Sequence, residues 1–309
     1  MIIGNMHAVK SALKSLRTSQ PFNYVTTSVT FGALNVAGIR PEFIVKHLHR
    51  VGTVRRRLPN GRTLSLWSRG DDWVSNQIYW RGWDGYEQET APVFFKLATR
   101  AAVTIDIGAY VGYYTLIAAH ANPTGRVFAF EPLTTIRKRL IRNVELNQVK
   151  NVECVAVAAG DIDGEASFFH LDAELPTSSS LSFEFMRPAI NLVSSSVRVV
   201  TLDRFVADRG IAKIDLLKID TESTECRVLR GMARTLERDR PDVLCEVLHG
   251  RADEAGLEEL LGPLGYRYYL LTPEGPTERK HIEGHPAWLN YLFSTADRST
   301  VGPSLECRQ

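Results

Sequence analysis

The chain has 309 residues, of which 44% are hydrophobic and 23% are charged, and its formal net charge is +2. This composition predicts a substantial buried core, and the lack of internal repeats or long low-complexity tracts excludes a solenoid or a linker protein. No apolar run approaches the roughly 18–20 residues of a membrane helix, and the N-terminus lacks the apolar core of a secretion signal, so we expect a soluble cytoplasmic protein.

Residues 1–98 predict an N-terminal appendage. Residues 8–16 have the spacing of a short basic helix, and residues 53–68 alternate around Asn60 and Gly61, a strong signal for a β-hairpin. Residues 73–87 then concentrate five aromatic side chains. Such a segment either forms one wall of an acceptor site or packs the appendage onto the rest of the chain.

Positive charge is concentrated in the first 70 residues. They hold eleven Lys or Arg against one acidic residue, Glu42, a net charge of +10, so the remainder carries −8. Such a segment either binds an anionic partner, such as nucleic acid, a membrane surface or an acidic substrate, or forms a solvated basic face. Because the densest run, Arg55 to Arg57, has no interleaved aromatic residues, we favour the solvated face.

From about residue 100 onward, apolar strand-like runs alternate with helical patterns. The expected strands are 103–107, 126–131, 152–160, 214–220, 242–248, 266–271 and 289–294, with helical spacing at 111–120, 134–147, 224–237 and 252–264. This alternation predicts an α/β fold with a mostly parallel, seven-stranded sheet, helices on both faces and an antiparallel last strand. The Ser-rich residues 176–196 are expected to form a surface loop or lid.

A turn with an acid and two glycines follows the first of these strands, with Asp106, Gly108, Ala109 and Gly112. In an open parallel sheet, ligands bind beyond the carboxyl ends of the strands, where glycines let the backbone approach them. A dinucleotide site needs a Gly-x-Gly-x-x-Gly turn and a helix N-terminus for its pyrophosphate, which Asp106 would repel. S-adenosylmethionine carries a sulfonium and an ammonium without phosphate, so a carboxylate favours it.

Two further acids follow the next two strands. Glu131 stands 19 residues after Gly112, about where an acid accepts the ribose hydroxyls in this architecture. Asp161 ends the third strand, where a carboxylate could accept from an adenine amino group. Each acid could instead cap the following helix. Together, three acids at three successive strand ends predict a site for S-adenosylmethionine.

The motifs DIGAYVGYYT, FEP, NVELN, VAAGD, TLDRF and KIDTESTE with VLRG resemble those of the FkbM-type S-adenosylmethionine-dependent methyltransferases, over residues 85–269. The resemblance implies the class I Rossmann-like fold, with residues 99–300 as the methyltransferase domain and 301–309 as a tail. It implies a cofactor pocket lined by Asp106, Gly108, Ala109, Gly112, Glu131 and Asp161. It also places Glu87 at the methionine end of the cofactor. Where the family usually has a glycine after the glutamate of KIDTE, this chain has Ser223 and Thr224.

Methyl transfer to a hydroxyl needs a base near the attacking oxygen. Asp220 and Glu222 follow the fourth strand, and Glu246 and His249 follow the fifth, so all four are expected at one sheet edge. We take Glu222 or His249 as the candidate base, with Asp220 orienting cofactor or acceptor. Alternatively, Glu222 and Glu225 cap the next helix and His249 is an exposed loop residue. A further option is that Asp220, Glu222 and Glu246 hold Mg²⁺ or Ca²⁺.

We therefore expect an O-methyltransferase that uses S-adenosylmethionine and acts on a hydroxyl of a small-molecule, sugar, glycolipid or polyketide-type acceptor in biosynthesis. A homo-oligomer is compatible with the sequence. One alternative is a nucleic-acid methyltransferase that uses the basic N-terminal region, although the Asn- or Asp-Pro-Pro-aromatic signature of base methylation does not follow the fourth strand. The others are a non-catalytic binding protein of the same fold, suggested by Ser223 and Thr224, and a dehydrogenase.

Overall fold

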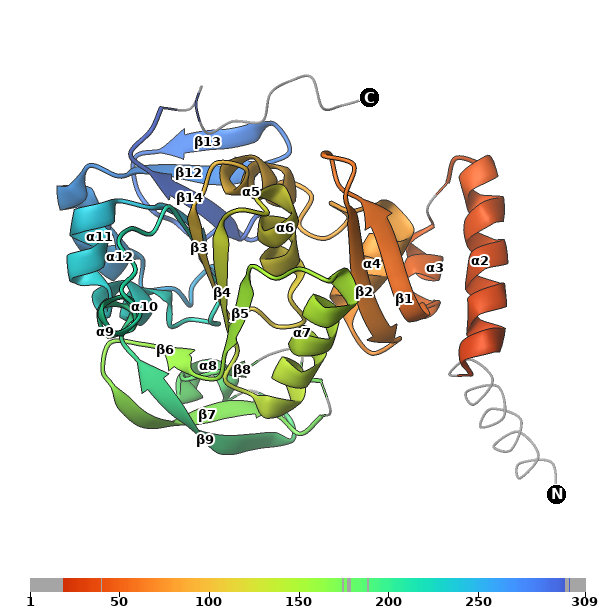
Figure 1. The fold of residues 1–309 in the computed structure, drawn as a ribbon, viewed down its shortest axis with the longest axis horizontal. Helices are drawn as coiled ribbons and strands as arrows, with labels where there is room; N and C mark the ends of the chain where they lie inside the picture. Colours follow the sequence, from red (N-terminus) through yellow and green to blue (C-terminus); the bar gives the residue numbers. More distant parts are fainter. Residues whose placement is uncertain are drawn as a thin grey trace. The chain divides into compact units, whose positions relative to one another are not determined.

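The computed structural model divides into two compact units, Met1–Tyr86 and Glu87–Gln309 (Figure 1). It describes residues 19–39, 41–173, 175–176, 179–187, 189–297 and 300. The helix expected over residues 8–16 and the tail 301–309 lie outside the described residues. The division comes earlier than the boundary expected after residue 98, because helix α5 (Ala91–Ala98) packs against α6 (Tyr113–Ala121) of the second unit.

The first unit contains a β-hairpin and the helices that pack on it. Its described elements are α2 (Gln20–Val36), α3 (Glu42–His47), β1 (Val51–Arg57), β2 (Thr63–Arg69) and α4 (Trp73–Arg81). The two strands pair antiparallel from Val51↔Arg69 to Arg57↔Thr63, across the turn that holds Asn60 and Gly61. Both α2 and α4 contact β1, so the hairpin is the framework on which the helices of this unit rest.

The aromatic segment over residues 73–87 begins as α4, and two of its aromatic side chains, Tyr79 and Trp80, are buried in the first unit. The Asp72 side chain caps the helix by accepting from Ser75 N at 2.6 Å. Trp80 is 1% exposed, and its indole Nε1 donates to the Leu48 carbonyl at 2.9 Å. Its ring also lies 5.0 Å from that of Tyr79, nearly perpendicular to it. These contacts are those of a satisfied core aromatic inside the first unit, a role that was not among the two expected for this segment.

A mostly parallel sheet forms the centre of the second unit, with the strand order β13-β12-β14-β11-β10-β3-β4-β5. Its strands are β3 (Val103–Ile107), β4 (Arg126–Phe130), β5 (Val152–Val155), β10 (Leu216–Ile219), β11 (Asp242–Glu246), β12 (Arg267–Thr272), β13 (Gly275–Arg279) and β14 (Asn290–Ser294). The neighbours from β5 to β11 are parallel, and β14 lies antiparallel between β11 and β12. The α/β architecture and the antiparallel last strand expected from the sequence are confirmed.

Within the described residues this sheet has eight strands rather than the expected seven. The extra strand is β13, which turns back onto β12 through the pair Thr272↔Gly275. The short polar segment GPTER lacks the apolar run that marks the other strands, because an edge strand needs few buried side chains. The central strand β10 is the opposite case, since all four of its side chains are buried.

Helices cover both faces of the central sheet. Figure 1 shows α5, α6 and α7 (Thr134–Asn147) together on one side, and α9 (Leu202–Asp208), α10 (Glu225–Arg230), α11 (Ala233–Asp239) and α12 (Glu254–Leu261) grouped on the other. Strand β4 shows the alternation, because Phe128 and Phe130 pack with Phe205 of α9 whereas Ala129 packs with Leu140 of α7. None of the helices among the described residues has the length and hydropathy needed to cross a membrane.

A second, smaller sheet accounts for two departures from the expected pattern. Its described strands are β6 (Ala158–Ala159), β7 (Gly164–Leu171), β8 (Ser179–Ser180) and β9 (Leu192–Val200), in the order β6-β9-β7-β8. The strand expected over 152–160 is therefore split, because β6 leaves the central sheet to pair with β9. The loop expected over 176–196 instead contains β8, the short helix α8 (Phe183–Met186) and the start of β9, where backbone pairing with β7 tolerates exposed serines.

We expect the free energy of unfolding to depend strongly on the centre of the sheet. Leu217 in β10 is fully buried, so Leu217→Ala should lower it by about 2–5 kcal/mol through lost burial and a residual cavity. Ile162 is 67% exposed, so the control Ile162→Ala should change it by no more than about 0.5 kcal/mol. Urea unfolding followed by circular dichroism measures both. Equal effects of the two substitutions would contradict this description of the core.

Candidate functional site

The turn between β3 and α6 is in backbone contact with the loop after β10. Gly108 has φ +78°, and a Cβ built there would lie 1.8 Å from the carbonyl oxygen of Asp220. Gly112 begins α6 with φ +92°, and a Cβ there would lie 2.6 Å from Cδ1 of Leu140. Gly108 is thus required by a close backbone contact as well as by its left-handed conformation, whereas at Gly112 the left-handed conformation is the main constraint. Ala109 follows the first of them and is 5% exposed.

Asp106, near the end of β3, is held inside this turn. Its carboxylate is 1% exposed and accepts a hydrogen bond from Thr115 Oγ1 of α6 at 2.6 Å. Burial raises the pKa of Asp106, and the positive charge of Lys218 opposes that rise. The acid predicted from the sequence therefore lies at the carboxyl end of the strand, with one oxygen already engaged by the helix that follows.

Lys218 in β10 is a buried cation that the sequence reasoning missed. It is 3% exposed, its Nζ lies 2.7 Å from Asp220 Oδ2, and it stands 4.9 Å from the centre of the Tyr114 ring. Tyr114 in turn donates from its hydroxyl to the Glu87 carboxylate. Burial alone would lower the pKa of Lys218, but the charges of Asp220, Asp106 and Glu87 raise it overall. The sequence signal was a single lysine within an otherwise apolar strand.

Glu131 follows β4 and faces the same turn. It is 4% exposed, and Leu133 N donates to its Oε1 at 2.9 Å. Burial raises the pKa of Glu131 to about 8, although hydrogen bonds from the backbone of Leu133 and Tyr110 and the charge of Arg137 act against it. Through Tyr110, which lies between Gly108 and Gly112, Glu131 is coupled to the β3–α6 turn.

Glu246, the last residue of β11, lies among other acids. Its Oε2 is buried and has no hydrogen-bond partner among the described residues. Burial raises the pKa of Glu246 well above its usual range, and the negative charges of Asp220, Glu222 and Glu87 raise it further. Burial therefore favours the protonated form of this carboxyl group, and a protonated carboxyl can donate a hydrogen bond. The sequence analysis treated Glu246 only as a possible metal ligand.

The segment after β10 is a tight turn in an unusual conformation. Glu222 and Ser223 have φ +55° and +76°, both in the left-handed region. Ser180 Oγ donates to the Glu222 carbonyl at 2.7 Å, and Glu225 Oε1 accepts from Thr221 N at 3.0 Å and Ser223 N at 3.2 Å. Ser223 therefore occupies a conformation that glycine adopts without strain, at the position where the resemblance led us to expect glycine. Glu225 thus holds the turn before α10, and the helix itself has no side-chain cap hydrogen bond.

Asp161 and His249 are engaged by partners away from this group of acids. Asp161 Oδ1 accepts from Arg227 Nε at 3.0 Å and Nη2 at 2.9 Å. Burial would raise the pKa of Asp161, but the Arg227 hydrogen bonds and charge lower it overall. His249 is exposed, and its Nδ1 lies 2.7 Å from the Gly284 carbonyl. A bound adenine would thus share Asp161 with Arg227.

From the sequence, the acids after β10 and β11 were also expected as possible ligands of a cation. Among the residues that the structure describes, no group of three or more His, Cys, Asp or Glu is arranged to hold a metal ion. Asp220, Glu222 and Glu246 therefore do not form the ligand set considered from the sequence. The Lys218 ammonium already takes Asp220 Oδ2, and burial raises the pKa of Glu246.

We expect removal of the Lys218 charge to destabilise the fold. Lys218→Met leaves several buried acids uncompensated and should lower the free energy of unfolding by about 3–5 kcal/mol, part of which Asp220→Asn restores in the double variant. Lys213→Met is the matched control, because Lys213 pairs with Asp215 at 2.9 Å but is 61% exposed, and should cost at most about 1 kcal/mol. Denaturant titrations of the variants measure this, and equal losses for the two lysines would contradict it.

A family model and several named relatives match this chain. The family model described as "Methyltransferase FkbM domain" matches residues 106–295. The chain is 29% identical over 185 residues to the AMB antimetabolite synthetase AmbE of Pseudomonas aeruginosa, covering 50% of this chain but only 9% of that protein. It is 27% identical over 250 residues to the 31-O-demethyl-FK506 methyltransferase FkbM of Streptomyces tacrolimicus, covering 71% of this chain and 90% of that protein.

Among solved structures, the methyltransferase FkbM from Methylobacillus flagellatus matches with a TM-score of 0.41 and 14% identity, over 63% of this chain and 43% of that chain. The family match at residues 106–295 covers more than half of this chain and runs from the end of β3 through β14, including the strand-end acids. The chain therefore belongs to the FkbM family and is an S-adenosylmethionine-dependent methyltransferase.

Proposed function

We propose that this methyltransferase modifies a hydroxyl of a small-molecule, sugar, glycolipid or polyketide-type acceptor in biosynthesis. The observation that carries the proposal is the group of carboxyl side chains of Asp220, Glu222 and Glu246, at the ends of β10 and β11 beside the β3 turn. A hydroxyl acceptor loses its proton as it attacks, so it needs a nearby base. The name of the Streptomyces relative, a 31-O-demethyl-FK506 methyltransferase, is that of an enzyme acting at oxygen.

The residues at the β3 edge fit the proposed cofactor. When bound, S-adenosylmethionine supplies a methyl group on a positively charged sulfur. The acid-rich edge around Asp106 and Glu87 suits its positive charges, and the glycines at 108 and 112 keep side chains out of the turn. We assign the cofactor to Glu87, Asp106, Gly108, Ala109, Gly112, Glu131 and Asp161. Of these, Glu131 would accept the ribose hydroxyls and Asp161 the adenine amino group.

Among the candidate bases, the contacts favour Glu222 over His249. The Glu222 charge acts on buried Glu246 and so lies within the group of acids, whereas His249 is exposed and engaged by the Gly284 carbonyl. In this assignment Glu222 takes the hydroxyl proton. Asp220, held by Lys218, orients the acceptor.

Transfer of a labelled methyl group from S-adenosylmethionine to a panel of hydroxylated acceptors tests this function. We expect an O-methyl ether as product, and Glu222→Gln should lower kcat by about 10²–10⁴-fold while S-adenosylhomocysteine still binds. His249→Gln is the comparison variant and should retain kcat within about threefold if its ring only contacts the Gly284 carbonyl. Product methylated at nitrogen or carbon, or a loss in His249→Gln that Glu222→Gln does not show, would overturn the assignment.

The raised pKa of Glu131 predicts how cofactor affinity depends on pH. Below about pH 8 the buried carboxyl is protonated, and it must ionise to accept two ribose hydroxyls. The affinity for S-adenosylhomocysteine should therefore rise from pH 6 to 8, by up to about tenfold per pH unit, and level off above pH 8. Calorimetric titration measures the affinity, and repeating it in buffers of different ionisation enthalpy counts the proton released.

The matched variants for this titration are two Glu→Gln substitutions. Glu131→Gln should bind weakly and without that pH dependence, because an amide does not titrate. Glu237 is exposed on α11, so Glu237→Gln should behave like the parent protein. Affinity that is independent of pH in the parent protein, or unchanged in Glu131→Gln, would remove Glu131 from the ribose site.

A further inference from the structure

Helix α2 of the first unit exposes a row of apolar side chains. Its fully buried residues are polar, Asn23 and Thr27, and its half-buried Phe31 packs on Tyr79 and Trp80, with ring centres 5.3 and 5.9 Å apart. Four other apolar side chains lie exposed on one face, which we call the α2 stripe: Phe22, Val25, Val29 and Val36, exposed by 43%, 59%, 66% and 92%. Their spacing of three, four and seven residues places them along one side of a helix, opposite the buried pair.

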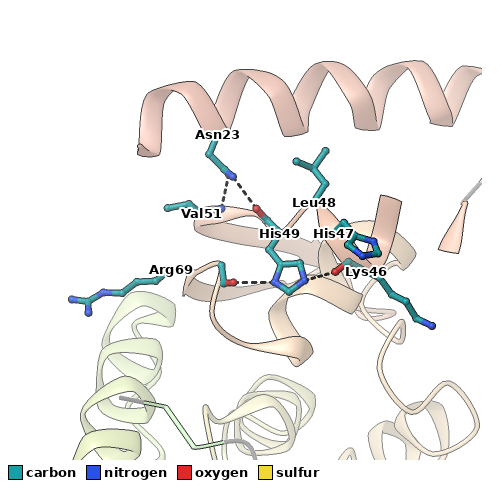
Figure 2. A pocket seen from close by; sticks show the side chains of 8 residues that line it. Asn23, Lys46, His47, Leu48, His49, Val51 and Arg69 are labelled. Carbon is teal, nitrogen blue, oxygen red and sulfur yellow. Dashed lines mark hydrogen bonds between the residues drawn. The ribbon is translucent and has the colours of Figure 1, made fainter. Parts of the chain in front are cut away.

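Hydrogen bonds on the polar side hold the helix in this orientation. Figure 2 shows Asn23 bonded to the strand below, where its Nδ2 donates to the His49 carbonyl at 2.9 Å and its Oδ1 accepts from Val51 N at 2.7 Å. One turn further on, Arg50 Nη1 donates to Thr27 Oγ1 at 2.5 Å. Turning the stripe inward would break these bonds and leave the Arg50 guanidinium buried without them. The outward stripe is therefore built into the packing of the first unit.

Helix α2 has no charged residues, but the first unit to which it belongs is positively charged. No charged residue occurs between Arg17 and Arg40, a stretch that includes all of α2. The first unit as a whole has twelve Lys or Arg against four Asp or Glu, a net charge of +8. Next to α2, a cavity of about 260 Å³ is lined by Asn23 together with Lys46, His47 and Arg69 (Figure 2). Cationic side chains thus lie beside the helix as well as before and after it in the sequence.

We propose that α2 lies flat on an anionic lipid bilayer, with the α2 stripe in the headgroup–acyl boundary. A 17-residue helix is about 25 Å long, and an exposed apolar face flanked by Lys and Arg is the arrangement of interfacial helices. The charge decides between a bilayer and a second copy of the chain. Two first units, each at +8, repel each other, whereas each Lys or Arg near an anionic surface strengthens binding.

Sedimentation of the full chain with extruded vesicles tests this proposal. The probes are vesicles of phosphatidylcholine alone and vesicles in which about a third of the lipid is phosphatidylserine. We expect at least about tenfold tighter binding to the anionic vesicles, weakening as salt rises because the attraction is screened. Equal binding to both vesicles, or no binding to either, would overturn the proposal.

Matched substitutions separate the stripe from general exposure of apolar side chains. Val25→Asn with Val29→Asn should weaken vesicle binding at least about tenfold. The control pair Ile162→Asn with Ile190→Asn, in the second unit and exposed by 67% and 84%, should leave it unchanged. Arg55→Gln with Arg57→Gln, both exposed in β1, should reduce binding to anionic vesicles and its salt dependence. Equal losses in the stripe and control pairs would contradict the assignment of α2.

Two further measurements address the other occupants of the α2 stripe. Sedimentation equilibrium without lipid should show the same mass for the parent and the stripe variant, and a dimer that only the stripe variant loses would assign the face to a second copy. An RNA oligonucleotide that displaces the protein from vesicles, and binds the stripe variant equally well, would assign the basic charge to nucleic acid. Binding of S-adenosylhomocysteine should be equal in all variants, which shows that the second unit is folded in each.

Discussion

The edge of the central sheet where the strands end depends on one buried ammonium group. Nζ of Lys218 lies 2.7 Å from Asp220, and its charge also acts on Asp106 and Glu87. Acids brought together in a buried site cannot all ionise unless a cation compensates them. Glu131 and Glu246 show the alternative, because neither has a salt-bridge partner among the described residues and burial raises the pKa of both. Burial and the Lys218 charge therefore act in opposite directions on the carboxyl groups of this edge.

Close backbone contacts hold these groups in register. Gly108 touches the Asp220 carbonyl, so the turn after β3 and the turn after β10 cannot move independently. Gly231 makes a similar contact elsewhere in the second unit, because a Cβ built there would lie 1.9 Å from the Gly160 carbonyl oxygen. The left-handed conformation at Ser223 shows that the turn after β10 keeps a shape suited to glycine even without one. The cost of about 1–3 kcal/mol for such strain is tolerated where the surrounding contacts determine the conformation.

The two units carry net charges of opposite sign, and the positively charged first unit also exposes apolar side chains on α2. Hydrogen bonds of Asn23, Thr27 and Arg50, together with the packing of Phe31, hold α2 on its unit and leave the α2 stripe outside. The membrane proposal follows from that exposed stripe together with the +8 charge of the first unit. It is independent of the chemistry at the sheet edge, since methyl transfer depends on residues of the second unit.

The sequence by itself determined the central α/β sheet and the edge at which the strand-end acids and glycines lie, because hydrophobic periodicity and strand ends are local features. It did not predict β13, the pairing of β6 with β9 or the outward face of α2, because these depend on backbone pairs and polar contacts between distant segments. Only the tertiary structure decided which acids hold protons, that Arg227 takes Asp161 and that Lys218 stays charged, since burial and neighbouring charge set the pKa of each group.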